Sequence, residues 1–428
     1  MSSNFIHIDI NSYFASLLQQ ENPFLRGKPV GVIKDVGRTC IIAASKEAKK
    51  YGVKTGSNVK EAKKLIPSII LIPAKFDLYL HCTKKLKQIF ESITPDAEIF
   101  SLDEAFIPLD NCVYLYSDPY KLALNIQEKI KKELGEWVTC NIGIGENRLL
   151  AKTAGEIAPK GSILKIVDEI NPADIPKEKG FLIMTKDELL KTAKFSDVCG
   201  IGFRLEERLK PFGVEHPYQI NSLSDEVLEK YFGPFYSQAL RRIGKGEESY
   251  ILNRPENAHM KGVGRTITGY KLCSSEDAIK RVLYNLTEEV TYKVRKMDMA
   301  GRLIFVFLTG SNGGGEKSWH GHKTLKHYIR HTNEMFNILY HSLYKKWKRN
   351  FSVIRFGVGL SLLKPLKETP YPLLTEWYKN ERLYKAMDKI SDKFGLFTIR
   401  SGVLKEEEII RPEVTGFLGD KKYQLDYN

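Results

Sequence analysis

The chain has 428 residues, of which 42% are hydrophobic and 28% are charged. At roughly 100–200 residues per domain, this length predicts about two to four domains, and the composition excludes a wholly disordered or fibrous protein. The formal net charge is +14, from 66 Lys and Arg against 52 Asp and Glu. Such an excess of positive charge indicates a polyanionic partner, either nucleic acid or an anionic membrane surface.

The sequence shows no sign of a membrane span or of secretion. No apolar run approaches the roughly 18 residues that a span needs, and the residues after Met1 lack the basic and apolar regions of a secretory signal. The six cysteines lie far apart and form no Cys-x-x-Cys pair. We therefore expect neither a zinc site nor a disulfide framework, and we expect a reduced, cytoplasmic compartment.

The first 165 residues alternate strand-like apolar runs with helical patterns, which predicts an α/β or α+β fold with a mixed sheet. The expected strands are Phe5–Ile10, Pro29–Ile33, Thr39–Ala43, Ile69–Ile72, Glu98–Phe100, Ala105–Leu109 and Val138–Ile144. The expected helices are Ser12–Leu18, Ser45–Tyr51, Lys60–Ile66, Leu78–Ile93, Tyr120–Leu134 and Arg148–Ile157.

The pattern changes near residue 166. Residues 166–245 look mostly helical, and the polar stretch 253–257, which contains a proline, is a candidate linker. Residues 260–362 follow the order strand, helix, strand, strand, helix, strand, which is typical of a split β-α-β unit. The elements expected there are Gly264–Leu272, Glu276–Lys296, Leu303–Thr309, a segment near 317–323, Thr332–Trp347 and Val353–Leu362.

Two acidic positions carry the chemical signal. Asp9 lies at the end of an apolar strand, and Asp103 and Glu104 lie between two strand-like runs. Neighbouring residues of a regular strand face opposite ways, so Asp103 and Glu104 can share a site only at a bend. Three clustered carboxylates repel one another unless a hard cation such as Mg²⁺ or Mn²⁺ neutralises them. From spacing alone, the alternative is a strand-end cap and a solvated acidic turn.

Five motifs surround or follow these carboxylates in the sequence. They are Asp9-x-Asn11-x-Tyr13-Phe14-Ala15, the Gly-Lys-Pro-Val of 27–30, the segments 47–56 and 143–152, and Ser101-Leu102-Asp103-Glu104-Ala105-Phe106. In this order they resemble the motifs of the Y-family of lesion-bypass DNA polymerases, and the resemblance covers residues 5–365. Asn11 and Lys49 are more similar to the UmuC-like branch than to the DinB-like branch.

The resemblance implies an α+β multidomain fold in the shape of a right-hand polymerase. Its expected parts are a catalytic palm at 1–22 and 78–165, small fingers at 23–77, a helical thumb with a helix-hairpin-helix at 166–245, a linker at 246–257, a DNA-binding little finger of order β-α-β-β-α-β at 258–365 and a C-terminal tail at 366–428. The implied enzyme is a template-directed DNA polymerase that extends a primer 3′ end. It would be specialised for translesion synthesis and would lack proofreading.

The resemblance also implies roles for single residues. Asp9, Asp103 and Glu104 would be the catalytic carboxylates, and with the backbone carbonyl of Ile10 they would bind two Mg²⁺ ions, for which Mn²⁺ could substitute. Phe14 stands at the steric-gate position that rejects ribonucleotides. The implied nucleotide-binding set is Asn11, Ser12, Tyr13, Phe14, Lys46, Lys49 and Lys160.

The three lysines of this set depart from the family pattern. Lys46 and Lys49 stand where many members carry Tyr and Arg, and Lys160 is displaced by one residue from the usual Lys-Pro order. Lysine pairs with phosphate as a point charge and lacks the bidentate fork of arginine. For Lys46, a solvated helix face is the alternative.

Several features indicate DNA binding. Gly200 and Gly202 bracket a turn whose backbone N–H groups could bind a DNA phosphate. Residues 258–350 hold 17 Lys and Arg against 7 Asp and Glu, a net charge of +10. The candidate contacts in that segment are Lys261, Arg265 and Arg330. Its histidines at 320, 322, 327 and 331 lack a completing Cys or acidic partner, and a basic loop facing DNA explains them better than a metal site does.

The expected partners are primer-template DNA, deoxynucleoside triphosphates and a sliding clamp, for which Tyr423–Asp426 is a weak match. We expect a monomer. Two other functions remain open. A nucleotide cyclase also uses a palm-like fold, although the Gly-Ile-Gly turn and the basic segment argue against it. A catalytically weak or inactive DNA-binding scaffold of the same fold is kept open by the lysines at 46, 49 and 160.

Overall fold

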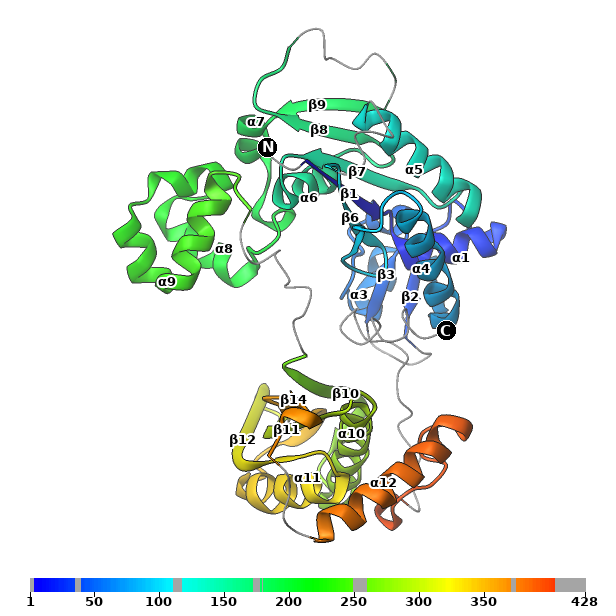
Figure 1. Cartoon of the computed structure of the whole chain (residues 1–428), viewed down its shortest axis with the longest axis vertical. Coiled ribbons are helices and arrows are strands. Elements are labelled where there is room, and N and C mark those ends of the chain that lie inside the picture. Colours follow the sequence, from blue (N-terminus) through cyan, green and yellow to red (C-terminus); the bar gives the residue numbers. More distant parts are fainter. Residues whose placement is uncertain are drawn as a thin grey trace. The chain divides into compact units, whose positions relative to one another are not determined.

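The computed structural model describes residues 4–34, 40–110, 118–171, 178, 180–248, 260–370 and 375–404. These residues form two compact units (Figure 1), a first unit up to residue 248 and a second unit from residue 260. The first unit contains a six-stranded and a three-stranded sheet, and the second contains a five-stranded sheet. Helices accompany every sheet, so the α+β class expected from the sequence is confirmed.

The main sheet of the first unit has the strand order β5-β6-β1-β7-β8-β9. The strands are β1 (Phe5–Ile10), β5 (Glu98–Ile99), β6 (Glu104–Pro108), β7 (Cys140–Gly145), β8 (Ile163–Val167) and β9 (Phe181–Thr185). The central strand β1 is antiparallel to β6 and β7, whereas β7, β8 and β9 run parallel to one another. The sheet is therefore mixed, as predicted. Strands β8 and β9 were missed: β8 straddles the change of pattern near residue 166, and β9 lies in a region that looks helical from its sequence.

Helices cover both faces of this sheet. On one face, α4 (Phe76–Glu91) and α5 (Pro119–Leu134) bury the isoleucines of β1 in a shared apolar core. On the other face, α6 (Arg148–Ile157) packs directly on β7, because position 143 has no side chain. A Cβ on Gly143 would overlap the carbonyl oxygen of Ala151 in α6. Helix α1 (Tyr13–Glu21) follows β1 directly.

The rest of the first unit forms two smaller groups of elements. In the three-stranded sheet, β2 (Val30–Ile33) lies between β3 (Ile41–Ala44) and β4 (Ile70–Pro73), with α2 (Lys46–Lys49) and α3 (Val59–Leu65) nearby in the chain. The helices α8 (Phe203–Leu209) and α9 (Asp225–Gly244) share a separate apolar core. Helix α7 (Lys186–Thr192) instead packs its Leu189 in a small cluster with residues of α6 and β8. Helix α9 is kinked at Gly233, which has a φ of 78° and directly precedes Pro234.

The second unit confirms the predicted order of strand, helix, strand, strand, helix, strand. Its strands β10 (Gly262–Cys273), β13 (Ser352–Ser361), β11 (Met299–Ser311) and β12 (Glu316–Ile329) are adjacent in that order, and β14 (Lys364–Pro365) pairs with β11. The helices α10 (Glu276–Lys296) and α11 (Thr332–Ile338) share an apolar core with the sheet.

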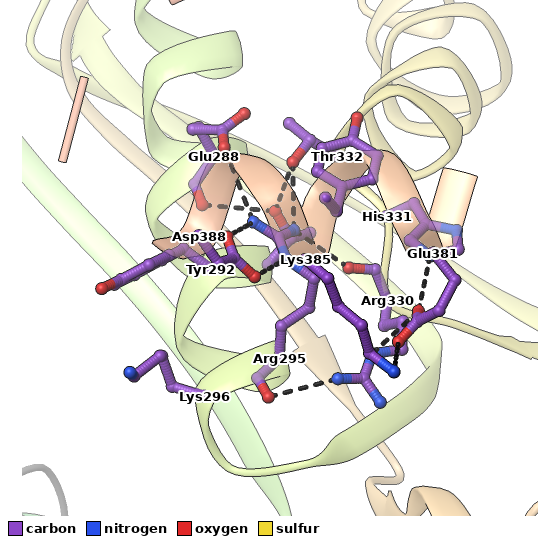
Figure 2. Close-up of polar contacts among 12 residues, drawn as sticks. Glu288, Tyr292, Arg295, Lys296, Arg330, His331, Thr332, Glu381, Lys385 and Asp388 are labelled. Atoms are coloured by element: carbon purple, nitrogen blue, oxygen red, sulfur yellow. Dashed lines mark hydrogen bonds and ion pairs between the residues drawn. The ribbon is translucent and has the colours of Figure 1, made fainter. Parts of the chain in front are cut away.

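Helix α12 (Thr375–Phe394) lies in the segment 366–428, for which the sequence predicted only a C-terminal tail. Figure 2 shows how its polar side chains meet those of α10 and of the residues around α11. Arg295 of α10 is 6% exposed and donates to both carboxylate oxygens of Asp388, at 2.8 and 2.9 Å. Nearer the end of the helix, Asp392 pairs with Lys296 at 2.9 Å. These ion pairs join residues that are more than 90 positions apart in the sequence. A local sequence pattern therefore cannot predict them.

Within the described part of the chain, no helix is long and apolar enough to cross a membrane. The cysteines described by the structure, Cys40, Cys82, Cys140, Cys199 and Cys273, are all free thiols.

Replacing Arg295 by Met should destabilise the second unit, because Asp388 then stays largely buried without a cation. We expect the free energy of unfolding of the full chain to fall by about 3 kcal/mol. The matched control is Lys296→Met, since Lys296 is half exposed and its pair with Asp392 should contribute about 1 kcal/mol or less. Denaturant unfolding followed by circular dichroism measures both, and equal losses would contradict a special role for the buried pair.

Candidate functional site

The predicted carboxylates meet where β1 ends and β6 begins. Asp9 and Glu104 are direct partners in the antiparallel register, so their side chains share one face of the sheet. Asp103 comes just before β6, and its carbonyl oxygen accepts a hydrogen bond from the Ile10 N–H at 3.0 Å. The Asp103 carboxylate accepts a second bond from the Ser101 hydroxyl at 2.5 Å. The bend that the sequence required for a shared site is therefore present.

Positive charge compensates Asp9 and Asp103 only in part, through Lys152. Burial, followed by the charge of Asp103, raises the pKa of Asp9 to about 8. The pKa of Asp103 is also raised, chiefly by burial and against the hydrogen bond from Ser101. Two buried carboxylates whose ionised forms are disfavoured make a set of oxygen donors that a hard cation would complete.

Glu104 is in a different electrostatic state from its neighbour. Lys152 of α6 donates to its Oε2 at 2.6 Å, and His7 Nε2 lies 3.5 Å from the same oxygen. Burial alone would raise the pKa of Glu104, but the His7 hydrogen bond and the Lys152 charge lower it to about 2. In the part of the chain that the structure describes, no three His, Cys, Asp or Glu side chains are grouped so as to hold a metal ion.

His7 is fully buried beside this carboxylate. Burial lowers its pKa to about 4, so the imidazole is neutral at pH 7 despite the neighbouring Glu104. Its ring lies so close to α6 that a Cβ added at Gly155 would come within 2.9 Å of the ring atom Nδ1. Neither His7 nor Lys152 was given a role from the sequence, although Lys152 ends the motif at 143–152. For His7 a signal existed, since it precedes Asp9 by two residues and so lies on the same strand face. For Lys152 the contact with Glu104 follows only from how α6 packs against the sheet, which the sequence does not show.

The aromatic residues after Asp9 divide into one core residue and one partly open residue. Tyr13 is buried, and its hydroxyl donates to the carbonyl oxygen of Tyr79 at 2.8 Å. Phe14 is half-buried and stacks on the Tyr79 ring, with centroids 4.2 Å apart. Ser12 is in the left-handed region with φ 51° and makes no side-chain cap bond to α1. This arrangement fixes the Phe14 ring beside the strand end that carries Asp9.

Two predicted nucleotide contacts have their side chains turned into the protein. Asn11 is buried and donates to Thr139 Oγ1 and to Asn141 Oδ1, both at 3.2 Å. Tyr13 is committed to the bond with Tyr79. A nucleotide contact from either position would therefore have to come from the backbone.

The three predicted lysines differ in their surroundings. Lys46 lies with its ammonium 5.1 Å from the centroid of the Trp137 ring, which gives it a partner inside the protein. Lys49 is exposed, and its pKa is lowered by desolvation and by the like charge of Lys160, while Asp9 and Asp103 oppose that shift. Lys49 thus interacts electrostatically with Lys160 and with the two carboxylates, and Lys160 is also exposed.

The Gly-Ile-Gly turn has the backbone that its sequence indicates. Gly200 has a φ of 102°, a backbone conformation that residues other than glycine rarely adopt. Gly202 is the exposed N-cap of α8. No atom lies within 4 Å of a Cβ built on Gly202. The turn therefore presents open backbone on the surface of the first unit.

Of the three predicted DNA contacts in the second unit, only Lys261 is fully exposed. Arg265 donates to Glu289 at 2.6 Å. Arg330 is 4% exposed and donates to Asp298 at 3.0 Å, and its Nε lies 3.7 Å from Glu381 of α12 (Figure 2). This geometry leaves Arg330 no open face for a phosphate, so its prediction is corrected: it is an internal ion-pair residue.

The described histidines of the second unit form no cluster that could hold a metal ion. His331 is buried and bonds to Glu381 at 3.0 Å, while exposed His327 bonds to Glu334 at 3.0 Å. His320 and His322 lie on β12 and are exposed.

Three comparisons with known proteins bear on this site. The family model described as the impB/mucB/samB family matches residues 8–156, and the model of the C-terminal domain of that family matches residues 260–370. DNA polymerase IV of Moorella thermoacetica is 31% identical over 403 residues, which cover 92% of this chain and 94% of that protein. DNA polymerase IV of Pelotomaculum thermopropionicum is 29% identical, with coverage of 93% and 96%.

The fold is also similar to solved structures. A Y-family DNA polymerase chimera of Dbh and Dpo4 gives a TM-score of 0.66 at 23% identity, covering 84% of this chain and 98% of that one. An insertion ternary complex of Dbh DNA polymerase gives a TM-score of 0.54 at 23% identity, with the same coverage. At this identity the likeness concerns the fold.

The raised pKa of Asp9 predicts a pH-dependent stability in metal-free buffer. A neutral Asp9 stabilises the fold fully below its ordinary pKa near 3.8, and this contribution is lost as the pH rises through about 8. We expect Asp9→Asn to be more stable than the unsubstituted chain at pH 7 by about 2–4 kcal/mol, with the difference shrinking toward pH 4.

Thermal unfolding in the presence of a chelator measures this difference. Asp110→Asn is the control, because Asp110 is exposed just beyond the far end of β6 and should leave the profile unchanged. An Asp9→Asn profile that runs parallel to that of the unsubstituted chain from pH 4 to 8 would show that Asp9 is not destabilised by ionisation.

Proposed function

Since the chain belongs to the impB/mucB/samB family and is a Y-family DNA polymerase, we propose that it extends primers across damaged templates by two-metal phosphoryl transfer, without proofreading. The observation that carries the proposal is the pair of partly buried carboxylates, Asp9 and Asp103, which lie at the adjoining ends of two paired strands and whose charge Lys152 compensates only in part. The substrates would be primer-template DNA and deoxynucleoside triphosphates, and the Dbh ternary complex, a neighbour in fold, fits this assignment.

The donor set fits divalent magnesium. Asp9 and Asp103 both offer carboxylate oxygens, the ligands that Mg²⁺ prefers, and their ionised forms need a nearby cation. Together with the Ile10 carbonyl they would hold the ions, and Mn²⁺ could substitute. Bound there, such ions would lower the pKa of the attacking hydroxyl and neutralise charge on the transferring phosphate.

Glu104 is expected to join this set, although Lys152 and His7 now hold its Oε2. The low pKa of Glu104 keeps it ionised at neutral pH, so it needs no deprotonation before it binds a cation. What Glu104 must do is exchange the Lys152 ammonium for another positive partner. Lys152 would thus act as a resident counter-charge.

We assign the polymerase parts as the sequence predicted them. The six-stranded sheet supports a catalytic palm at 1–22 and 78–165, and its last strand, β9, extends that sheet beyond the predicted boundary to residue 185. The sheet of β2, β3 and β4 supports fingers at 23–77. The helices α7 to α9 support a thumb at 166–245, with the Gly200 and Gly202 turn against a DNA phosphate. The second unit supports the little finger at 258–365. Helix α12 belongs to this same unit, so the tail from 366 is in part a structural element.

The finer assignments rest on fewer residues. The comparisons do not separate the UmuC-like from the DinB-like branch, and the relatives carry the name DNA polymerase IV, so the UmuC-like placement rests on Asn11 and Lys49 alone. Lys49 and Lys160 are the triphosphate contacts that the charges favour, and Lys46 is the weaker one because of Trp137. We retain Lys261 as a DNA contact and a clamp as a partner. The inactive-scaffold alternative is not favoured.

Asp103→Asn should nearly abolish synthesis, because one of the two donors at the centre of the site loses its charge. We expect primer extension with Mg²⁺ to fall by a factor of about 10² to 10³ or more. Asp110→Asn, the exposed control, should extend normally. The assay uses an undamaged template and one with an abasic site, and the unsubstituted chain should copy past both. Extension that persists in Asp103→Asn would sink the metal assignment, and arrest at the abasic site would sink the translesion assignment.

Phe14→Ala should admit ribonucleotides, because the ring that would meet the ribose 2′-hydroxyl is removed. We expect the ratio of ribonucleotide to deoxyribonucleotide incorporation to rise about tenfold to a hundredfold. Single-nucleotide insertion with each substrate measures the ratio. Phe24→Ala is the control, since Phe24 is 83% exposed in the same unit. An unchanged ratio in Phe14→Ala would refute the gate role.

A further inference from the structure

Asn141 is a fully buried polar residue on β7, the direct partner of Asp9 in the pairing of β1 with β7. The family motifs that identify the site gave this residue no role. Its side chain lies on the face of the sheet that α6 covers, between the strand that carries Asp9 and the turn 158–161 that carries Lys160. A buried amide is costly unless its hydrogen bonds are made, so its partners are informative.

All four hydrogen-bonding positions of the Asn141 amide are occupied. Its Nδ2 donates to the carbonyl oxygens of Gly155 and Ala158, at 3.0 and 2.9 Å. Its Oδ1 accepts from the backbone N–H of Gly161 at 2.8 Å and from Asn11 Nδ2 at 3.2 Å. An asparagine side chain can make two donor and two acceptor bonds. No other contact is therefore needed to explain why this residue is buried.

These bonds fix the turn from α6 to β8 on both sides. Asn141 binds Ala158 before Lys160 and Gly161 after it, and Gly161 needs its glycine because its φ is 84°. Gln127 of α5 adds a bond to the Gly161 carbonyl oxygen at 3.1 Å. The backbone on each side of Lys160 is thus tied to the sheet, while the lysine side chain is exposed.

We propose that Asn141 is a positioning residue for the incoming nucleotide: it holds the 158–161 turn, and with it Lys160, in register with Asp9. The inference rests on the proposed function, in which Lys160 meets the triphosphate. The same side chain holds Asn11, two residues after Asp9, so one amide couples the triphosphate lysine to the strand of the catalytic carboxylate. Aspartate lacks the two donors, and serine is too short to reach both Ala158 and Gly161.

The test separates positioning from folding through two measurements. The first is hydrogen exchange of the free protein, in which Asn141→Ser should expose the Gly161 amide and speed exchange in 158–161. The second is the Kd of the correct deoxynucleotide with Mg²⁺ on a primer that ends in a dideoxynucleotide, so that no chemistry occurs. We expect Asn141→Ser to raise this Kd about tenfold, with KM rising more than kcat falls.

Lys160→Ala supplies the second arm. If Asn141 acts through Lys160, Asn141→Ser should weaken binding little further in the Lys160→Ala background. Gln127→Ala, which loosens the turn without removing a buried group, should shift the Kd in the same direction by a smaller factor. Asn285→Ser is the folding control, because Asn285 is another buried asparagine and lies in the second unit. It should lower the melting temperature without changing the nucleotide Kd.

The outcomes are distinct. Unchanged exchange in 158–161, an unchanged Kd in Asn141→Ser, or fully additive losses in the double variant would each overturn the proposal. If the unsubstituted chain extends no primer at all, the proposed function fails instead. The exchange measurement then still decides whether Asn141 holds the turn.

Discussion

The candidate site depends on the direct packing of α6 against β7 at Gly143. No side chain separates the helix from the strand there, and a Cβ would overlap the Ala151 carbonyl oxygen. The close approach lets Lys152 reach Glu104 and brings the end of the helix within reach of Asn141. A larger residue at 143 would have to lift α6, and every polar contact between that helix and the sheet would lengthen together.

Two carboxylates that are neighbours in sequence have opposite environments because of this packing. Glu104 faces α6, and the hydrogen bond from His7 together with the charge of Lys152 holds its pKa low, whereas Asp103 is at the bend and its pKa is raised by burial. The protein therefore neutralises Glu104 internally and compensates the charge of Asp9 and Asp103 only in part. Such a division between adjacent carboxylates is typical of sites in which each group has a separate task.

The sequence predicted those parts of the molecule whose signals are local and periodic. The bounds of β1 and α6 match the predictions, since both show apolar periodicity over several turns or pleats. Strand β9 and helix α12 were missed because contacts with distant parts of the chain stabilise them. Strand β9 pairs in parallel with β8, and α12 is held by ion pairs to residues far away in the sequence.

The same distinction applies to the site. Asp9, Asp103 and Glu104 could be found from their motifs, but the division of charge among them depends on Lys152, which reaches Glu104 from α6. Arg330 was expected to contact DNA because it lies in a basic segment. Its partner Glu381 is 51 residues further along the chain, beyond any motif or local charge count.

Helix α12 also changes how the charge of the second unit should be counted. Its carboxylates Glu381, Asp388 and Asp392 lie within ion-pair distance of Arg330, Arg295 and Lys296. A cation that is already paired with a carboxylate cannot neutralise a phosphate, and so displace the cations condensed on the polyanion, without breaking that pair. The number of ions released when a polyanion binds is therefore smaller than the 17 Lys and Arg of residues 258–350 suggest. If the second unit binds DNA as proposed, counterion release would be left to open cations such as Lys261, and α12 would lower the salt dependence of that binding.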